Sequence, residues 1–348
     1  MKPPEKIALF DPNAVASAGA GLFGLPYSVS EARVVVVPVP WEVTVSYGGG
    51  TLKGPESIRA ASMQVDLYDP ELPGAWKLGV AMDTIPARLK SQSRELRKKA
   101  EKHIQQLAAG RPVDRKNITI IDAACQRMID HVRETTARHL AAGKMVALVG
   151  GDHSTPLGFM QALTAKYATF GVLQIDAHAD LRDAYEGFTF SHASIMFNAL
   201  KIKQIKRLVQ VGIRDYCESE ADLIRDSGGR VITHFDREIK DRVYSGKSIA
   251  SIHRAIVKDL PRDVYISFDI DGLDPKLCPN TGTPVPGGFE FEEALHLIKT
   301  VVLSGRRIIG LDINEVSPGP DEWDANVGAR LLFRMINLMA KSQKVKCA

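Results

Sequence analysis

Residues 170–180, FGVLQIDAHAD, join an apolar run directly to a group of carboxylate and imidazole side chains. The run FGVLQI predicts a buried β-strand, because short runs rich in Val, Ile and Leu are typical of strands covered on both faces. Asp176, His178 and Asp180 then alternate with alanine, and an extended backbone directs residues i, i+2 and i+4 to one side. The stretch therefore predicts a polar site at the end of a core strand.

Seven further apolar runs recur along the chain, separated by stretches of helical periodicity. This alternation predicts an α/β fold with a mostly parallel sheet covered by helices. Eight strands fit a closed barrel or an open sheet, and periodicity does not separate the two. We also expect two successive helices between about Ser91 and Ala142. The seven runs are RVVVVPV (33–39), LGVAM (78–82), MVALVG (145–150), RLVQVGI (207–213), RVITHF (230–235), DVYISFDI (263–270) and RRIIGLDI (306–313).

The composition is that of an ordinary globular protein, with 348 residues, 45% hydrophobic and 25% charged. We expect one domain over residues 33–348, preceded by an extension, residues 1–32, that is loop-like and lies on the surface. The extension contains GAGLFG (19–24), which spells GxGxxG but precedes the first strand, so the dinucleotide-binding interpretation fails and a flexible loop is expected. Four scattered cysteines predict neither a zinc knuckle nor a disulfide framework.

The charge and hydropathy patterns exclude several partners. No apolar run approaches the roughly 20 residues of a membrane span, and the first residues lack the apolar core of a secretory signal. The net charge of +4 is small, and the basic patches are mixed with acidic or apolar residues. We therefore expect a soluble, cytoplasmic protein with neither a membrane nor a nucleic acid as its partner.

Polar residues follow four of the predicted strands, where α/β folds bind their ligands. Burying several carboxylates together is costly unless a proton or a cation compensates the charge, and two divalent ions would balance four carboxylates. Oxygen donors with a pair of imidazoles suit Mn²⁺ better than zinc. Isolated helix caps explain single aspartates but not their alternation with histidine. The residues are Asp152 and His153; Asp176, His178 and Asp180; Asp269, Asp271 and Asp274; and Asp312 and Glu315, of which Asp152, Asp274 and Asp312 are interpreted as loop or supporting groups.

The motifs GGDHS (150–154), DAHADLRD (176–183), SFDIDGLDP (267–275), TGTPVPGG (281–288) and NEVSP (314–318) together resemble the ureohydrolase family of arginases, agmatinases and formiminoglutamases. SYGGGTLKGPESIRAAS (46–62) is similar to the N-terminal segment of that family. The resemblance runs from about Arg33 to the C-terminal helix. It implies an open three-layer αβα sandwich around an eight-stranded, mostly parallel sheet, assembly as a homotrimer or homohexamer, and two manganese ions per chain.

The resemblance also implies ligands and catalytic groups. His153, Asp176, Asp180 and Asp269 would hold one ion, and Asp176, His178, Asp269 and Asp271 the other, with Asp176 and Asp269 bridging. Two divalent ions can activate water to attack a guanidinium carbon at neutral pH. His192 in FTFSHAS matches the proton-shuttle position of the family, and Glu315 matches the carboxylate that pairs with the substrate guanidinium. The catalytic candidates are therefore His192, Glu315 and Asp180, the last also a metal ligand.

The substrate is predicted less sharply. The loop LRDAYEGFTFSHAS (181–194) lacks the Ser-Gly-Asn segment by which arginases hold an α-amino acid, and it is similar to agmatinase-like sequences, which favours hydrolysis of agmatine to putrescine and urea. Trp41 and Gly48 to Gly50 depart from typical agmatinases and are similar to proteins that resemble guanidine hydrolases, some of which use nickel. A short pocket containing Trp41 would favour guanidine or a guanidino acid, whereas Trp41 in the core would not. A metal-dependent deacylase is a remoter alternative, because its site usually needs one zinc and fewer carboxylates. A non-catalytic family member is also remoter, because every matched position is intact.

Overall fold

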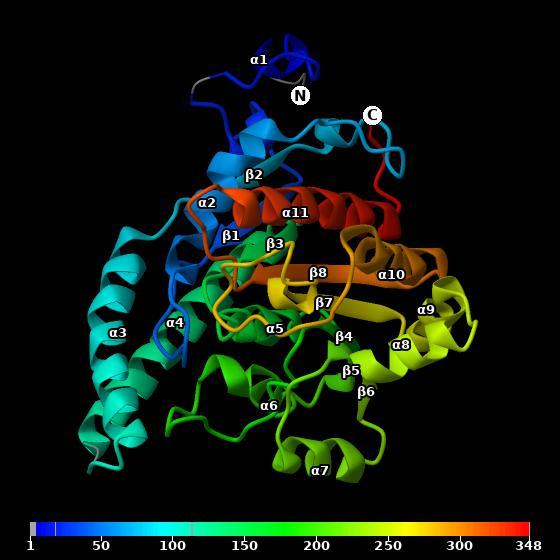
Figure 1. Cartoon of the computed structure of the whole chain (residues 1–348). Helices are drawn as coiled ribbons and strands as arrows, with labels where there is room; N and C mark the ends of the chain where they lie inside the picture. Colours follow the sequence, from blue (N-terminus) through cyan, green and yellow to red (C-terminus); the bar gives the residue numbers. More distant parts are fainter. Residues whose placement is uncertain (1–4, 18, 113, 348) are drawn as a thin grey trace.

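The computed structural model describes residues 5–17, 19–112 and 114–347, and it has three layers, with one sheet between two layers of helices (Figure 1). The strands follow the order β2-β1-β3-β8-β7-β4-β5-β6, and all seven pairings are parallel. The sheet is open, with β2 and β6 at its edges, so the predicted αβα sandwich is confirmed and a barrel is excluded. The strands are β1 Val34–Pro38, β2 Val80–Met82, β3 Met145–Val149, β4 Phe170–Ile175, β5 Ile205–Ile213, β6 Val231–Phe235, β7 Asp263–Asp269 and β8 Arg307–Asn314.

Helices fill the connections between the strands. The two longest, α3 and α4, confirm the prediction of successive helices before β3, and Asp114 caps α4 by accepting a hydrogen bond from the Lys116 amide. No helix in the described part of the chain is both long and apolar enough to cross a membrane. The helices are α1 Glu5–Ala8, α2 Gly54–Ala61, α3 Ala87–Ala108, α4 Arg115–Ala141, α5 Leu157–Leu163, α6 Ile195–Ala199, α7 Glu218–Asp226, α8 Asp236–Tyr244, α9 Ile249–Lys258, α10 Phe291–Leu303 and α11 Trp323–Ser342, with short 3-10 turns η1 Leu22–Gly24, η2 Thr51–Lys53, η3 Ser62–Gln64, η4 Ala75–Leu78, η5 His192–Ser194 and η6 Ile270–Gly272.

Successive side chains of each strand enter opposite cores. In β4, Leu173 and Ile175 join the core formed with α2 and α8 to α11, whereas Phe170 and Val172 join the core formed with α3 to α6. This alternation is the period of two that a pleated strand imposes. Both faces of the sheet are therefore buried, which explains why the strands read as continuous apolar runs.

The N-terminal extension contributes to the core. Leu22, Phe23 and Leu25 are at most 2% exposed, and the Phe23 ring lies 5.2 Å from that of Phe333 in α11 in an edge-to-face contact. The expectation that this segment only lies on the surface as a flexible loop is therefore wrong for residues 22–25. Apolar side chains within the glycine-rich stretch explain the difference, because their burial outweighs the flexibility of the glycines.

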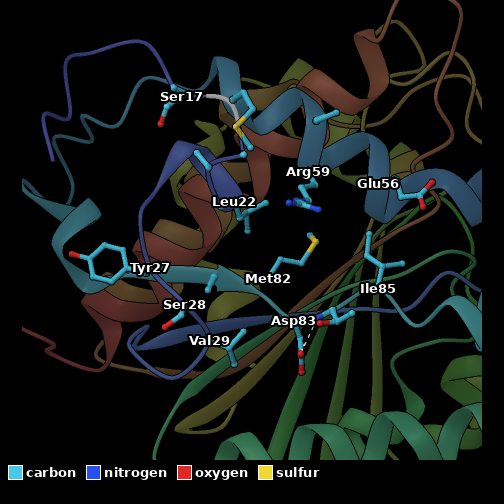
Figure 2. Close-up of a pocket in the computed structure, with 18 residues that line it drawn as sticks. Ser17, Leu22, Tyr27, Ser28, Val29, Glu56, Arg59, Met82, Asp83 and Ile85 are labelled. Carbon is cyan, nitrogen blue, oxygen red and sulfur yellow. Dashed lines mark hydrogen bonds between the residues drawn. The ribbon is translucent and has the colours of Figure 1, made fainter. Parts of the chain in front are cut away.

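A large cavity of about 910 Å³ lies between the extension, α2 and the edge strand β2 (Figure 2). The two acidic side chains that line it are already paired. Glu56 forms an ion pair with Lys90, and Asp83 accepts a hydrogen bond from His139 at 2.8 Å. This cavity therefore offers no free group of carboxylates and imidazoles for catalysis.

Candidate metal centre

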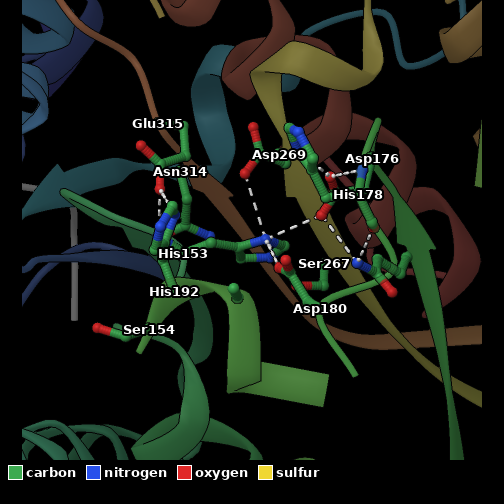
Figure 3. Close-up of polar contacts among 12 residues, drawn as sticks. His153, Ser154, Asp176, His178, Asp180, His192, Ser267, Asp269, Asn314 and Glu315 are labelled. Atoms are coloured by element: carbon green, nitrogen blue, oxygen red, sulfur yellow. Dashed lines mark hydrogen bonds and ion pairs between the residues drawn. The ribbon is translucent and has the colours of Figure 1, made fainter. Parts of the chain in front are cut away.

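The predicted site residues follow four strands that are neighbours in the centre of the sheet, β3, β8, β7 and β4. Parallel strands end at the same edge, so the residues that follow them meet although they are far apart in sequence. Figure 3 shows this convergence. His153 follows β3, and Glu315 follows β8. Asp269 ends β7, Asp271 lies within η6, and Asp176, His178 and Asp180 follow β4.

His153 lies at the centre of the first group. Its Nδ1 atom lies 3.0 Å from Asp176 Oδ2, 3.1 Å from Asp180 Oδ2 and 3.2 Å from Asp269 Oδ2, and all four side chains are at most 7% exposed. The four residues implied by the resemblance for one metal ion are therefore together.

His178 forms the second group with Asp176 and Asp271. Its Nδ1 atom lies 3.1 Å from Asp271 Oδ2 and 3.7 Å from Asp176 Oδ1. Asp176 thus belongs to both groups, as a bridging ligand must. Asp269, the other implied bridge, directs Oδ2 toward His153 and accepts a hydrogen bond from the Asp271 amide through Oδ1 at 3.0 Å.

A buried hydrogen-bond chain fixes the orientation of His153. Ser267 donates its proton to Asp312 at 3.2 Å, so its oxygen accepts the N–H of His153 Nε2 at 2.9 Å. Nδ1 then carries the free lone pair, faces three carboxylates and has no hydrogen-bond partner among the described residues. This is the arrangement in which a supporting acceptor turns an imidazole toward a metal ion.

Buried hydrogen bonds also fix the orientation of Asp176. Gln174 donates to Asp176 Oδ2 at 2.8 Å, and Gln210 of β5 donates to Gln174 at 2.6 Å. The motifs alone do not assign a role to Ser267, Gln174 or Gln210. A signal was present, because each is a polar residue inside an otherwise apolar strand, and a fully buried polar side chain needs a partner.

Two site residues adopt left-handed backbone conformations, Asp180 with φ 55° and Glu315 with φ 60°. Such angles are uncommon outside glycine and persist where surrounding contacts enforce them. The Asp180 carbonyl accepts the Met196 amide at 3.0 Å, and the Glu315 amide donates to Gly151 at 2.8 Å. These turns aim both carboxylates into the site.

The electrostatics of the cluster favour a cation. Burial, reinforced by the charge of Asp176, raises the pKa of Asp180 to about 6, and burial together with Asp271 raises the pKa of Asp269 well above its ordinary value. Four crowded aspartates and two imidazoles whose Nδ1 atoms face them fit divalent ions with oxygen and nitrogen ligands.

His192 lies beside this cluster at the start of η5. Its Nδ1 atom lies 3.5 Å from Glu315 Oε1, and its Nε2 atom lies 3.3 Å from Ser46 Oγ. Burial lowers the pKa of His192, but the hydrogen bond and charge of Glu315 outweigh this effect and raise it above the ordinary value of 6.5. Glu315 Oε1 also accepts the His153 amide at 2.9 Å, which ties the carboxylate to the metal cluster.

A cavity of about 140 Å³ opens onto the cluster. Its inner end is formed by His178, Asp180, His192 and Asp269. The proton-shuttle candidate His192 therefore faces the same space as three of the metal-ligand candidates. Trp41 does not line it. Instead Trp41 is 1% exposed within the core shared with α3 to α6, which assigns it to the core and excludes the interpretation that it shortens the pocket.

The glycines at 48–50 are explained by close packing. The Gly48 amide donates to Gly282 at 3.1 Å, and a Cβ at Gly48 would lie only 2.7 Å from that carbonyl oxygen. Gly50 has φ 130°, and its amide donates to Glu42 at 2.8 Å. These glycines let the loop that carries Ser46 pass against the segment 281–283.

The chain was compared with known proteins. The family profile described as Arginase family matches residues 32–337. N(1)-aminopropylagmatine ureohydrolase of Thermus thermophilus is 32% identical and covers 90% of this chain and 92% of its own length. Agmatinase of Bacillus anthracis is 28% identical, and the match covers 85% of this chain and 88% of that protein. The solved agmatine ureohydrolase of Thermoplasma volcanium shares the fold, with a TM-score of 0.69, 24% identity and 97% coverage of both chains.

These matches confirm the resemblance inferred from the motifs. Ureohydrolases of this family hydrolyse C–N bonds of guanidino compounds and depend on two metal ions. Because the profile spans most of the chain and a relative above 30% identity covers nine-tenths of it, the chain belongs to the Arginase family.

Proposed function

We propose that the protein hydrolyses a guanidinoalkylamine to urea and an amine, with agmatine as the first candidate and putrescine as its product. The observation that carries this proposal is the sharing of Asp176 by two ligand groups whose members His178, Asp180 and Asp269 line one cavity together with His192. Glu315 lies 3.5 Å from His192. The ligands are those implied by the resemblance: His153, Asp176, Asp180 and Asp269 for one ion, and Asp176, His178, Asp269 and Asp271 for the other.

Each group has a distinct part in the reaction. Two divalent ions at these residues would supply an activated water and neutralise the carboxylates. Glu315 orients the planar guanidinium by accepting its N–H groups, which places the central carbon over the cluster. His192 moves a proton to the leaving nitrogen, because the adjacent Glu315 raises its pKa and so favours the protonated imidazole. Asp180 completes the wall next to His192.

The cavity supports an extended substrate over free guanidine. Its lining includes Tyr185 and the half-exposed Tyr216 in addition to the carboxylates of the cluster, and Trp41 lies in the core and does not line it. The sequence lacks the arginase segment for an α-amino acid, which disfavours arginine. The names of the relatives, agmatinase and N(1)-aminopropylagmatine ureohydrolase, support a decarboxylated guanidine of this length or longer.

We also propose manganese as the native metal, with nickel as the alternative, assembly as a homotrimer or homohexamer, and a cytoplasmic location. The ligand set supports manganese because carboxylate oxygens outnumber imidazoles, and harder metals prefer oxygen. Metal content after expression with each ion decides between manganese and nickel.

The test is urea release from agmatine, N(1)-aminopropylagmatine, arginine, guanidine and 4-guanidinobutyrate, with protein loaded with Mn²⁺ or Ni²⁺. Agmatine or its aminopropyl derivative should be the best substrate. Asp176→Asn should abolish activity and binding of both ions, whereas Asp183→Asn, an exposed carboxylate in the same loop, should retain them. Arginine as the best substrate would contradict the proposed specificity, and guanidine as the best substrate would establish the alternative.

A further inference from the structure

The outer end of the catalytic cavity carries its own set of charged and aromatic side chains. We call Arg182, Tyr185, Asp215, Tyr216 and Glu220 the outer rim, because they line the cavity and lie outside the metal cluster. A substrate whose guanidinium lies at the inner end must pass its other end between these residues. Their chemistry therefore selects the distal group of the substrate.

Two charges of the outer rim compensate each other. Arg182 Nε lies 3.8 Å from Glu220 Oε2, and its guanidinium stacks 4.5 Å above the Tyr185 ring. Glu220 accepts the Leu181 amide through Oε1 and the Cys217 amide through Oε2, both at 2.9 Å, and it is 3% exposed. Glu220 is thus fixed by the backbone, and Arg182 already has an anionic partner.

Asp215 is different. Its carboxylate forms no hydrogen bond or ion pair with any residue in the described part of the chain, and it is exposed. Its backbone, however, is firmly placed, because the Asp215 amide donates to the Ala177 carbonyl at 3.1 Å and the residue pairs with His178 in a parallel bridge. The backbone position that carries this uncompensated charge is therefore fixed relative to the metal ligands that flank Ala177.

Aromatic rings complete the environment of Asp215. Tyr216 is 39% exposed and stacks on Phe235 with ring centroids 4.7 Å apart, which fixes its ring beside the cavity. Tyr185 lies in the loop that follows the metal motif, on the same rim. Ring faces favour contact with methylene groups and with ammonium cations, and they disfavour carboxylates.

We propose that Asp215 is the substrate-binding residue for the distal ammonium group of the guanidinoalkylamine. The inference rests on the proposed function and deepens it, because it names the group that separates an amine substrate from a guanidino acid. The carboxylate attracts an ammonium and repels a carboxylate, while the Arg182 charge that would attract a carboxylate is compensated by Glu220. The tyrosines contact the methylene chain between the two charged ends.

The experiment compares agmatine with butylguanidine, which has the same chain without the amine, and with 4-guanidinobutyrate, which has a carboxylate. Asp215→Asn keeps the shape and removes the charge. It should lower kcat/KM for agmatine by about tenfold through KM, since the hydrogen bond from the ammonium to a carboxylate is replaced by a weaker one to a neutral amide, and leave butylguanidine within about twofold. Asp215→Lys should reverse the preference toward 4-guanidinobutyrate. Asp183→Asn, which removes an exposed carboxylate that does not line the cavity, is the matched control and should change neither ratio.

Salt gives an independent readout. The preference of the unmodified protein for agmatine over butylguanidine should shrink as ionic strength rises, and that of Asp215→Asn should not. An agmatine-to-butylguanidine ratio that Asp215→Asn leaves unchanged would overturn the inference, provided the unmodified protein hydrolyses both compounds. A protein that releases urea from none of these substrates when loaded with metal would instead contradict the proposed function.

Discussion

Ser267 tests how the metal centre is organised, because it acts on a single ligand. Ser267→Ala removes the acceptor of His153 Nε2 at 2.9 Å and one of the donors to Asp312. His153 is 1% exposed, so water does not replace the lost partner. An unsatisfied buried donor costs about 1–3 kcal/mol, and loss of a group that orients a metal ligand typically weakens metal binding by about 10- to 100-fold.

The effect should be confined to one of the two ions. His153 belongs to the first group only, whereas the second is built from Asp176, His178 and Asp271. A calorimetric titration of metal-free protein with Mn²⁺ should therefore show one weakened binding step and one nearly unchanged step. At saturating Mn²⁺, kcat should recover to within a few-fold.

Thr136→Val in α4 is the control, because it removes a buried hydroxyl that has no hydrogen-bond partner in the described part of the chain. It should change neither binding step. Two unchanged steps in Ser267→Ala, at unaltered thermal stability, would refute the role assigned to the Ser267–Asp312 chain. Equal weakening of both steps would refute the division into two groups.

Three further outcomes are expected. His192→Asn should retain both metals and lower kcat by about 10²- to 10⁴-fold. Because the pKa of His192 is raised above its ordinary value of 6.5, the activity of the unmodified protein should decline as pH rises through that pKa. A decline that persists in the variant would assign the titration to another group. Trp41→Phe should lower thermal stability without changing the rate ratio of agmatine to guanidine, whereas a changed ratio would place Trp41 in the pocket. Phe23→Ala should destabilise the protein by about 3–5 kcal/mol in denaturant unfolding, and a loss below about 1 kcal/mol would contradict the packing of the extension into the core.

The eight strands were predictable from sequence because burial on both faces requires continuous apolar runs. The choice between barrel and open sheet was not, because it depends on which strands pair, and periodicity carries no such information. The resemblance supplied it, and the pairings of β2 and β6 on one side only confirm it. Similarly, Leu22 and Phe23 were hidden by the surrounding glycines, whose flexibility suggested a loop.

The metal motifs were visible because acidic and imidazole residues alternate directly after strands. The residues that orient them were overlooked, since Ser267 and Gln174 lie inside strands and only tertiary contacts reveal their partners. The left-handed turns at Asp180 and Glu315 were also unpredictable, because local propensity disfavours them and distant contacts enforce them. The charge of Asp215 is uncompensated because the nearby Arg182 pairs with Glu220, and the sequence does not show which carboxylate Arg182 contacts.

Urea release from agmatine by protein loaded with a measured amount of metal tests the central claim most directly. The account predicts about two divalent ions per chain, urea and putrescine in equal amounts, and loss of both metal and product in Asp176→Asn. A protein that binds two ions per chain and releases no urea from any guanidino compound would contradict it.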